Sequence, residues 1–241
     1  MRKVGILLKI FSKEEYKHDF LAGKIYMNTI QYFRDFEDSQ DGNVADKHEA
    51  IHSWLQPGEF KLMIGSEGDM REINQDSLSS PMTISLNSHM HSNIFCMTHL
   101  HSHEIDMENL NQGDLDKLKG FFTLPEDVIN LGKYAVVIHE PSIFLSKFRG
   151  KAQELYSNGE ISWYQSKQVS YYDEVNKSLV LESEMDAPFY KQSKFSHQNE
   201  YRFLIMRENG MNEALTIDIG DIRSICSEIA TADFNDLIEF H

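Results

Sequence analysis

The order of short apolar segments along the chain is the feature that most restricts its fold. Segments with a strand pattern outnumber those with a helical pattern and do not alternate with them regularly, which favours an α+β fold over a doubly wound sheet. The expected strands are residues 4–11, 24–28, 49–56, 59–64, 82–86, 93–97, 133–139, 163–172, 199–207, 215–219 and 222–226. The expected helices are residues 13–22, 114–122, 125–131, 141–148 and 232–240.

Turn and capping residues set the expected boundaries. Ser12 has the character of a helix N-cap, and Glu15 three residues later would complete a capping box. Gly23 would end that first helix. Residues 33–46 and 65–80 are polar and are expected to be connecting loops.

Length and composition favour a single globular unit. The 241 residues contain 41% hydrophobic and 25% charged residues, which is ordinary for a folded domain. No internal repeat or low-complexity tract divides the sequence. We therefore expect one domain over residues 1–241, large enough to bury a sizeable core.

The sequence favours a cytoplasmic protein that does not contact a membrane. Cys96 and Cys226 are the only cysteines, so no disulfide framework is indicated. The apolar run near the N-terminus, Gly5–Leu8, is too short for a signal peptide. No stretch approaches the roughly 20 apolar residues that a membrane-spanning helix requires.

The net charge of −15 argues against tight nucleic-acid binding, because affinity for phosphate backbones depends on clustered Lys and Arg. A small anionic ligand held by a few local cations remains compatible with this charge. One acidic segment is expected to form a solvated face. It contains Asp35, Glu37, Asp38, Asp41, Asp46 and Glu49.

The segment around residues 198–202 is the strongest candidate site. Because side chains alternate faces along a strand, Gln198, Glu200 and Arg202 would share one face. The other face would carry apolar core residues, namely Tyr201, Phe203 and Ile205. A carboxylate beside an amide and a guanidinium can hold a ribose hydroxyl and stabilise positive charge on a sugar. The alternative is a surface Glu–Arg pair of little energetic value.

A histidine-rich segment offers a competing site. It contains His89, His91, His99, His101 and His103, with Cys96 between them. Imidazoles two residues apart on a strand suit zinc, which would give a metal-dependent hydrolase or nuclease. No acidic residue recurs at a ligand spacing and the segment is rich in Ser and Asn, so we expect no metal. Cys96 is either a nucleophile beside a histidine or a small buried apolar residue.

Other catalytic motifs are missing from the sequence. It has no glycine-rich phosphate loop, no His-Glu-x-x-His pair and no nucleophile elbow. Tyr26, Tyr32 and Phe33 either stack on a flat ligand ring or belong to the core.

Three short motifs resemble the DUF2971-type family of bacterial proteins. The first is LLKIFSKEEYKHDFLAGKIYMNTIQYFRDFED, which has that family's initial strand–helix–strand form. The second is residues 94–98, Ile-Phe-Cys-Met-Thr, and the third is residues 191–202, where Gln198 replaces the first Glu of a Glu-x-Glu-x-Arg strand. Residues 32–35, Tyr-Phe-Arg-Asp, depart from the family's aromatic-Asn-Asp-Pro, and His-rich sequence replaces its Trp-Ser-His-Tyr-like stretch.

This layout is also similar to the ADP-ribosyltransferase fold in its Arg–Ser–Glu arrangement, with mixed, mostly antiparallel sheets and flanking helices. The resemblance implies NAD as the cofactor, with Glu200 and Gln198 as the catalytic Gln-x-Glu and Thr98 in the hydroxyl position. Lys9 would take the basic position in place of arginine, although Lys cannot form the planar two-point contact of Arg with phosphate. The further candidate NAD contacts are Ser12, Tyr32, Phe33, Arg34 and Arg202.

The resemblance implies cleavage of the nicotinamide–ribose bond and transfer of ADP-ribose to a protein or nucleic-acid acceptor. Such an enzyme would be a toxin or an anti-phage defence effector, and an antitoxin or inhibitor protein would be its partner. The alternative is a non-catalytic binding or regulatory module on the same scaffold.

Overall fold

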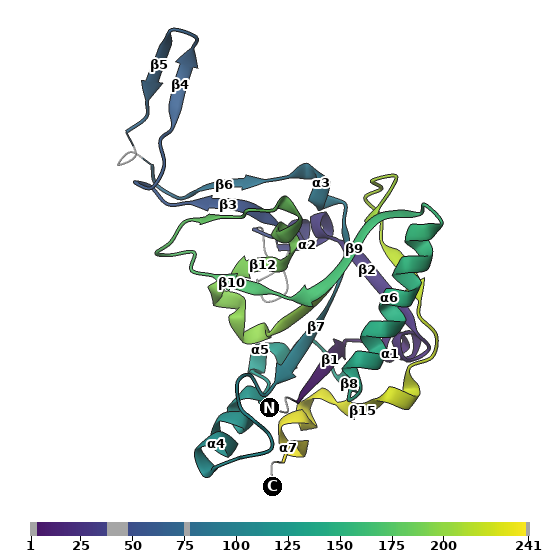
Figure 1. The fold of residues 1–241 in the computed structure, drawn as a ribbon. Coiled ribbons are helices and arrows are strands. Elements are labelled where there is room, and N and C mark those ends of the chain that lie inside the picture. Colours follow the sequence, from purple (N-terminus) through teal and green to yellow (C-terminus); the bar gives the residue numbers. More distant parts are fainter. Residues whose placement is uncertain (1–3, 38–47, 75–77, 240–241) are drawn as a thin grey trace.

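The computed structural model describes residues 4–37, 48–74 and 78–239. Within these residues the largest sheet has eight strands, and every pairing in it is antiparallel. Its main path is β14-β2-β7-β1-β8-β15, while β13 pairs with β7 and with β9 (Figure 1). The strands are β1 (Gly5–Phe11), β2 (Lys24–Thr29), β7 (Asn93–His101), β8 (Tyr134–Ile138), β9 (Ile161–Gln168), β13 (Glu200–Arg207), β14 (Leu215–Asp218) and β15 (Cys226–Ala230). The expected α+β class with mostly antiparallel sheets is confirmed.

Smaller sheets lie beside the main one. Strands β11 (Leu179–Val180), β3 (Ile51–Leu55) and β6 (Met82–Ser85) form a three-stranded antiparallel sheet. Strands β10 (Ser170–Tyr172) and β12 (Tyr190–Gln192) form a parallel pair. The 3-10 segment η2 (Glu184–Phe189) precedes β12.

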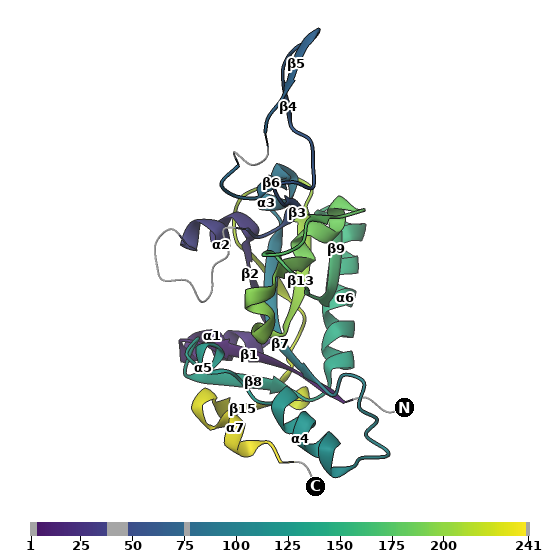
Figure 2. The same ribbon diagram turned by 90° about the vertical axis from the view of Figure 1, so that its left-hand side faces the viewer.

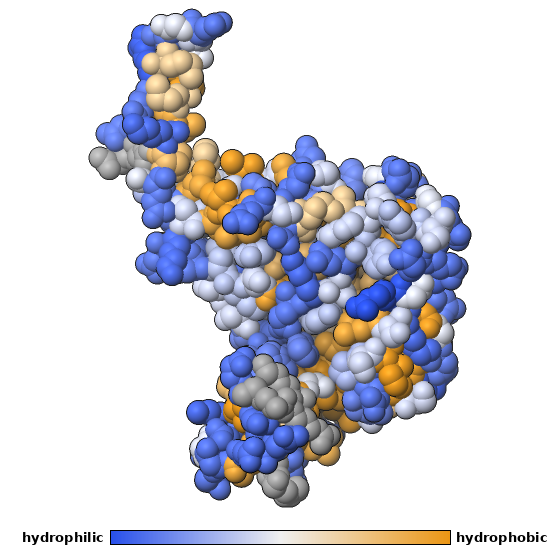
Figure 3. Space-filling model, in the orientation of Figure 1, coloured by the Kyte–Doolittle hydropathy of each residue, from blue (hydrophilic) through white to orange (hydrophobic). Residues whose placement is uncertain are grey.

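A two-stranded hairpin projects from the body of the molecule (Figures 1 and 2). It consists of β4 (Met63–Ser66) and β5 (Asp69–Glu72) and occupies part of the segment expected to be a polar loop. Gly68, with φ 90°, supplies the positive φ of the turn. Met63, Ile64 and Met70 are exposed on it, and the space-filling view shows this apolar surface along the arm (Figure 3).

Two helices contribute to the largest core. Helix α1 (Glu14–Leu21) supplies Phe20, and α6 (Pro141–Ser157) supplies Phe144 and Phe148. The Phe144 and Phe148 rings meet Phe203 of β13, with centroids 5.6 Å and 4.8 Å from it. The apolar face expected for residues 201–205 therefore packs into the core.

Other helices cover separate parts of the structure. A second apolar cluster joins β8 to α4 (Gln112–Phe121), α5 (Glu126–Ile129) and α7 (Phe234–Leu237). A third lies beside α2 (Ile30–Glu37) and α3 (Asn87–Met90). None of the helices in the described ranges is long and apolar enough to cross a membrane.

Several expected boundaries were wrong: helix α6 runs to Ser157 instead of ending near residue 148, and the strand expected over residues 59–64 begins only at Met63. Three others lie at the ends of α1, α2 and β15. Helix α1 begins at Glu14, and its N-cap is Lys13, whose side chain makes no capping bond, so Ser12 is not the cap. Residues 30–37 form helix α2 where a loop was expected from residue 33, because Ile30 and Phe33 pack into the third cluster. Residues 223–225 form a 3-10 turn, and the last strand begins only at Cys226 because it pairs with β8. Residues 38–46 of the expected loop lie outside the described residues.

The main sheet splits along one edge of β7. Strand β13 pairs with residues 93–98 along the other edge, so both β1 and β2 pair with β7 opposite β13. Pairing with β1 ends at Leu8–Thr98, and pairing with β2 ends at Asn28–Ile94. Residues 95–97 of β7 pair with neither strand, so β1 and β2 diverge around them.

Candidate functional site

A cavity of about 770 Å³ opens where the main sheet splits. Strands β1, β2, β7 and β13 all contribute to its lining. Most of the residues expected to form a site line this cavity, although they come from distant parts of the chain. They are Lys9, Tyr32, Phe33, Thr98, Gln198, Glu200 and Arg202.

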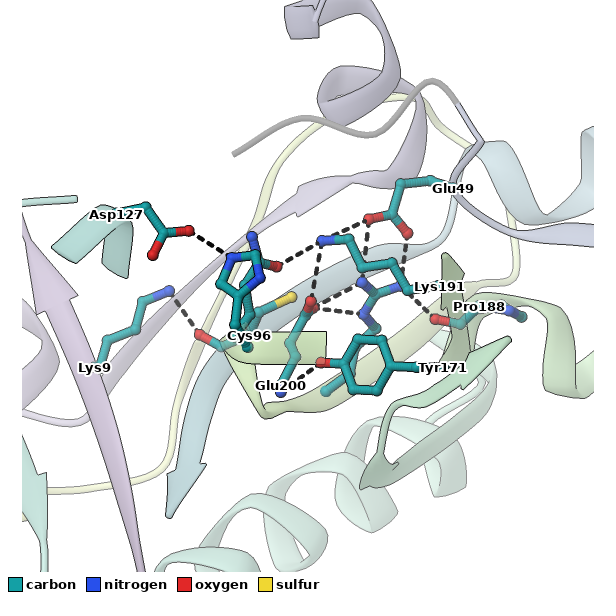
Figure 4. A network of polar contacts seen from close by, with 11 residues as sticks. Lys9, Glu49, Cys96, Asp127, Tyr171, Pro188, Lys191 and Glu200 are labelled. Carbon is teal, nitrogen blue, oxygen red and sulfur yellow. Dashed lines mark hydrogen bonds and ion pairs between the residues drawn. The ribbon is translucent and has the colours of Figure 1, made fainter. Parts of the chain in front are cut away.

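Glu200 is a buried carboxylate with both oxygens engaged (Figure 4). Its Oε1 accepts hydrogen bonds from Arg202, from Nε at 2.9 Å and from Nη2 at 2.7 Å. Its Oε2 accepts one from Nζ of Lys191 at 3.3 Å. Burial alone would raise the pKa of Glu200, but the charges of Arg202 and Lys191 hold it well below its usual range. Glu200 is therefore ionised at neutral pH.

Arg202 is only 1% exposed and uses every N–H donor within the protein. Beyond its two bonds to Glu200, Nη1 and Nη2 donate to the two oxygens of Glu49 at 2.8 and 3.2 Å. Nη1 also donates to the carbonyl oxygen of Pro188. A guanidinium has five N–H donors, and these contacts use all of them. Arg202 therefore has no donor left for a diphosphate, and the surface pair considered from the sequence is instead a buried one.

Glu49 is a site residue that sequence reasoning missed. It was expected on a solvated acidic face, yet it is 2% exposed and binds Arg202. Asp35 is exposed as expected, while Asp38, Asp41 and Asp46 lie outside the described residues. The only local signal was position, because Glu49 immediately precedes the buried residues Ala50 and Ile51.

Lys191 is the second missed residue, although it lies within the third family-like motif. Its Nζ lies 3.0 Å from Oε1 of Gln198, 3.3 Å from Glu200 and 3.5 Å from Glu49. Burial lowers the pKa of Lys191, but the charges of Glu200 and Glu49 raise it overall. Together with Arg202, two cations and two carboxylates form a buried network whose formal charges cancel.

Gln198 was expected on the same strand as Glu200 but does not lie on it. It ends a 3-10 turn, Ser193–Gln198, and Asn199 then adopts a left-handed conformation with φ 44°. Strand β13 begins only at Glu200, whose N–H donates to the hydroxyl of Tyr171 at 2.9 Å. Gln198 and Glu200 nevertheless approach each other, because both accept a hydrogen bond from Lys191.

Lys9 bridges the split in the sheet. Its Nζ donates to the carbonyl oxygen of Cys96 at 2.7 Å and lies 4.5 Å from the centre of the Phe95 ring. Burial lowers the pKa of Lys9. The side chain thus links β1 to β7 beyond the point where their backbones stop pairing.

Cys96 lies in the cavity but does not have the properties of a nucleophile. Burial, together with the nearby charge of Glu200, raises the pKa of its thiol to about 12. A thiol with this pKa is protonated at neutral pH, whereas the thiolate is the reactive form. Thr98, two residues along β7, is the backbone partner of Glu200 in the sheet.

The aromatic candidates lie at the cavity and are partly accessible. Tyr26 is 59% exposed and Tyr32 47% exposed, although both line the cavity. Phe33 lines it as well and also packs against the third apolar cluster. Two of the three rings are therefore available to a ligand rather than buried in the core.

Two expected contacts are not brought to the cavity. Ser12 is exposed and does not line it. Arg34 also lies outside the lining, and its Nη1 is directed to Ser85 at 3.4 Å and to the sulfur of Met90 at 3.1 Å. These two residues therefore have no direct role at the site in this structure.

The histidines are dispersed rather than gathered around one point. His89 is buried on α3, and Nδ1 of His91 lies 2.7 Å from the carbonyl oxygen of Gly210. His99, His101 and His103 form a column, with ring centroids 4.6 and 3.9 Å apart. The described part of the chain contains no group of three or more His, Cys, Asp or Glu residues placed to hold a metal ion.

Comparisons of the chain with protein-family models, with curated proteins and with solved structures gave no match. Its function is therefore argued from the geometry and chemistry of this cavity.

Proposed function

We propose that this chain is an ADP-ribosyltransferase-like enzyme that uses NAD as its substrate. The observation that carries the proposal is Glu200, an ionised and buried carboxylate in a cavity at the split of the sheet, with Gln198 beside it. A fixed negative charge of this kind stabilises positive charge that develops on a bound sugar. The cavity volume is within the usual range for small-molecule sites, roughly 300–1,000 Å³.

In the proposed reaction the bond between the ribose anomeric carbon and the nicotinamide nitrogen breaks. The electron pair leaves with nicotinamide, and the ribose passes through an oxocarbenium-like transition state, as in glycoside hydrolysis. A lone pair of the acceptor then forms the new bond, and the acceptor loses a proton. Glu200 would accept a hydrogen bond from the ribose 2′-hydroxyl and stabilise the cation, and Gln198 would orient the acceptor.

The lowered pKa of Glu200 restricts its role in this reaction. A carboxylate with a pKa well below its usual range is a weak base, so Glu200 would act through its charge and not by removing the acceptor's proton.

The other cavity residues have roles that fit NAD. Tyr26, Tyr32 and Phe33 would contact the flat rings, and Lys9 is the candidate for the diphosphate. Thr98 would contact the ribose beside Glu200. Arg202 would position Glu200 and would not bind phosphate, because its donors are already used.

The test is NAD turnover by the purified protein, followed as nicotinamide release and as transfer of labelled ADP-ribose to a cell lysate. Glu200→Gln should reduce turnover at least a hundredfold, since one electrostatic contact to a transition state is worth roughly that factor. Glu49→Gln is the matched control, because it removes one charge from the same network without touching Glu200. Equal turnover by Glu200→Gln and the unaltered protein would refute the proposal.

A second candidate function is a binding module that keeps the cavity without catalysis. Both oxygens of Glu200 and all five donors of Arg202 already have protein partners, which favours this alternative. Calorimetric titration with NAD separates the two functions. Binding with turnover supports the transferase, whereas binding without turnover supports the module.

We further propose a macromolecular acceptor and an inhibitor protein as partners, as expected of a toxin or a defence effector. Expression of the unaltered chain would then arrest growth of a bacterial host, and Glu200→Gln would relieve the arrest. Arrest that persists in the variant would count against a toxic transferase activity.

A further inference from the structure

The two residues of the Gln-x-Glu pair are separated by a break in the strand. Gln198 ends a 3-10 turn, Asn199 is left-handed and Glu200 begins β13. Strand alternation therefore does not fix the position of one side chain relative to the other. Another part of the molecule has to set their relative placement.

Lys191 contacts both side chains, and Figure 4 shows it beside Glu200. Its Nζ lies 3.0 Å from Oε1 of Gln198 and 3.3 Å from Oε2 of Glu200. We propose that Lys191 is a positioning residue, whose ammonium group holds Gln198 and Glu200 in a fixed relation for the reaction. This inference rests on the function proposed above.

Lys191 is itself held firmly. It lies on β12, in register with Tyr171 of the parallel strand β10, and Tyr171 in turn accepts the N–H of Glu200. The Phe195 ring lies 4.6 Å from Nζ, and the lysine side chain is only 4% exposed. A side chain with so little freedom can transmit its position to its partners.

Charge compensation explains the contacts of Lys191 with Glu49 and Glu200, because Arg202 alone would leave these two carboxylates with a net charge of −1. It does not explain the contact of Lys191 with Gln198. Gln198 is neutral and needs no counter-ion, yet it accepts the shortest contact that Lys191 makes in the network. A role of Lys191 in orienting Gln198 relative to Glu200 explains why Lys191 contacts Gln198.

The test compares Lys191→Met/Glu49→Gln with Glu49→Gln alone. Lys191→Met by itself would leave a net charge of −1 in the buried network, whereas the double variant keeps the sum at zero, with Arg202 and Glu200 still paired. The double variant therefore matches the unaltered protein in net charge, and Glu49→Gln alone, whose network sums to +1, shows what the loss of Glu49 contributes. Both variants are first checked for folding by circular dichroism and thermal unfolding.

The double variant should keep its NAD affinity within a few-fold of Glu49→Gln but lose turnover by about a hundredfold, as expected when a reacting group is misplaced. The acid limb of its pH–rate profile should also move to higher pH, since Glu200 has lost one of two neighbouring cations. A purely structural role would leave that limb in place. Equal turnover and equal pH profiles in the two variants would overturn the inference.

Two measurements keep the inference testable independently of activity. In the NAD-free protein, carbon-13 labelling of glutamate carboxyl groups, with Glu200→Gln for assignment, follows the titration of Glu200. A Glu200 pKa that rises in the double variant supports the contact even if NAD is not the substrate, and an unchanged pKa refutes it. If the double variant does not fold, the exchange of the Lys191 Nζ protons with water is measured in the unaltered protein. Slow exchange, with these protons near the Gln198 amide, supports the contact. Rapid exchange refutes it.

Discussion

Arg202 donates two hydrogen bonds to a single oxygen of Glu200, which lies two residues earlier on the same strand. The bonds come from Nε and Nη2 and leave the second carboxylate oxygen facing Lys191. Residues two positions apart on a strand share a face, so the geometry of the strand itself allows this contact. What makes it unusual is that the shared face is buried, with Arg202 among the largest fully buried side chains.

Replacing Arg202 should destabilise the fold strongly. In Arg202→Met the carboxylates of Glu49 and Glu200 would keep Lys191 but lose the guanidinium that binds both of them, and breaking a buried ion pair by removing one partner typically costs about 3–5 kcal/mol. We expect a loss of that size in the free energy of unfolding, measured with urea. Arg202→Lys should recover only part of it, because one ammonium group cannot replace five N–H donors in a planar fork. Full stability in Arg202→Lys would show that charge alone matters.

The stability of the protein should depend on pH through Glu200. Its pKa is lower in the folded state than the unperturbed value of about 4.3, so the unfolded state binds more protons as the pH falls below that range. The contribution of Glu200 is therefore complete above about pH 5 and is lost as the pH falls toward the folded pKa. Urea unfolding at several pH values between 3 and 7 should show a steeper acid loss in the unaltered protein than in Glu200→Gln. Identical pH dependence in the two proteins would contradict the shift.

The sequence was sufficient for the parts of the fold that depend on local apolar patterns. The strands around residues 134–138 and 200–207 are continuous apolar or alternating segments, and both lie where expected. The start of helix α1 was misplaced by about one residue, because Ser12 has the right chemistry for a cap but the N-cap position is occupied by Lys13. Such boundaries depend on where the preceding strand ends, which local composition does not fix.

The candidate site was predictable only in part, because its missing members act over long distances. Gln198, Glu200, Lys9 and Thr98 carry the motif, and the structure does bring them to one cavity. Glu49 stands in an acidic stretch, and its position before Ala50 and Ile51 was the only local sign of burial; its burial depends on Arg202, which lies 153 positions later. The pairing of two carboxylates with two cations is a property of the assembled sheet and not of any one segment.

The Cys96 thiol should react slowly at neutral pH. Burial raises its pKa to about 12 and the pKa of Cys226 to about 11, so both thiols are protonated. Alkylation by iodoacetamide at pH 7 should be much slower for either than for a free cysteine, whose pKa is about 8.5. Peptide mass spectrometry measures the two rates separately. Rapid labelling of Cys96 would restore it as a candidate nucleophile.

The projecting hairpin should be dispensable for the stability of the body. All eight residues of β4 and β5 are exposed, and the two strands pair only with each other within the described chain. The N–H of Ile73 donates to the carbonyl oxygen of Leu62 at 2.8 Å, so two glycines can replace residues 63–72 without separating the flanking chain. We expect a melting temperature within a few degrees of the unaltered protein. A large fall would mean that the arm contributes to the folding of the body.

Two glycines should respond in opposite directions to alanine, one in the turn between α1 and β2 and the other in helix α6, which contributes no residue to the cavity lining. Gly23 follows α1 and has φ 95°, and a Cβ there would lie 2.3 Å from the carbonyl oxygen of Gly220. Gly23→Ala should therefore cost at least the roughly 1–3 kcal/mol of a strained residue, with the clash in addition. Gly150 lies inside helix α6, where a Cβ would meet nothing within 4 Å, so Gly150→Ala should stabilise the protein by roughly 0.5–1 kcal/mol.

Because Gly23 joins α1 to β2, both of which line the cavity, its replacement should also weaken ligand binding, whereas Gly150→Ala should not. Chemical unfolding and NAD titration of the two variants measure both effects, and a stabilising Gly23→Ala would show that the turn between α1 and β2 is not held as described.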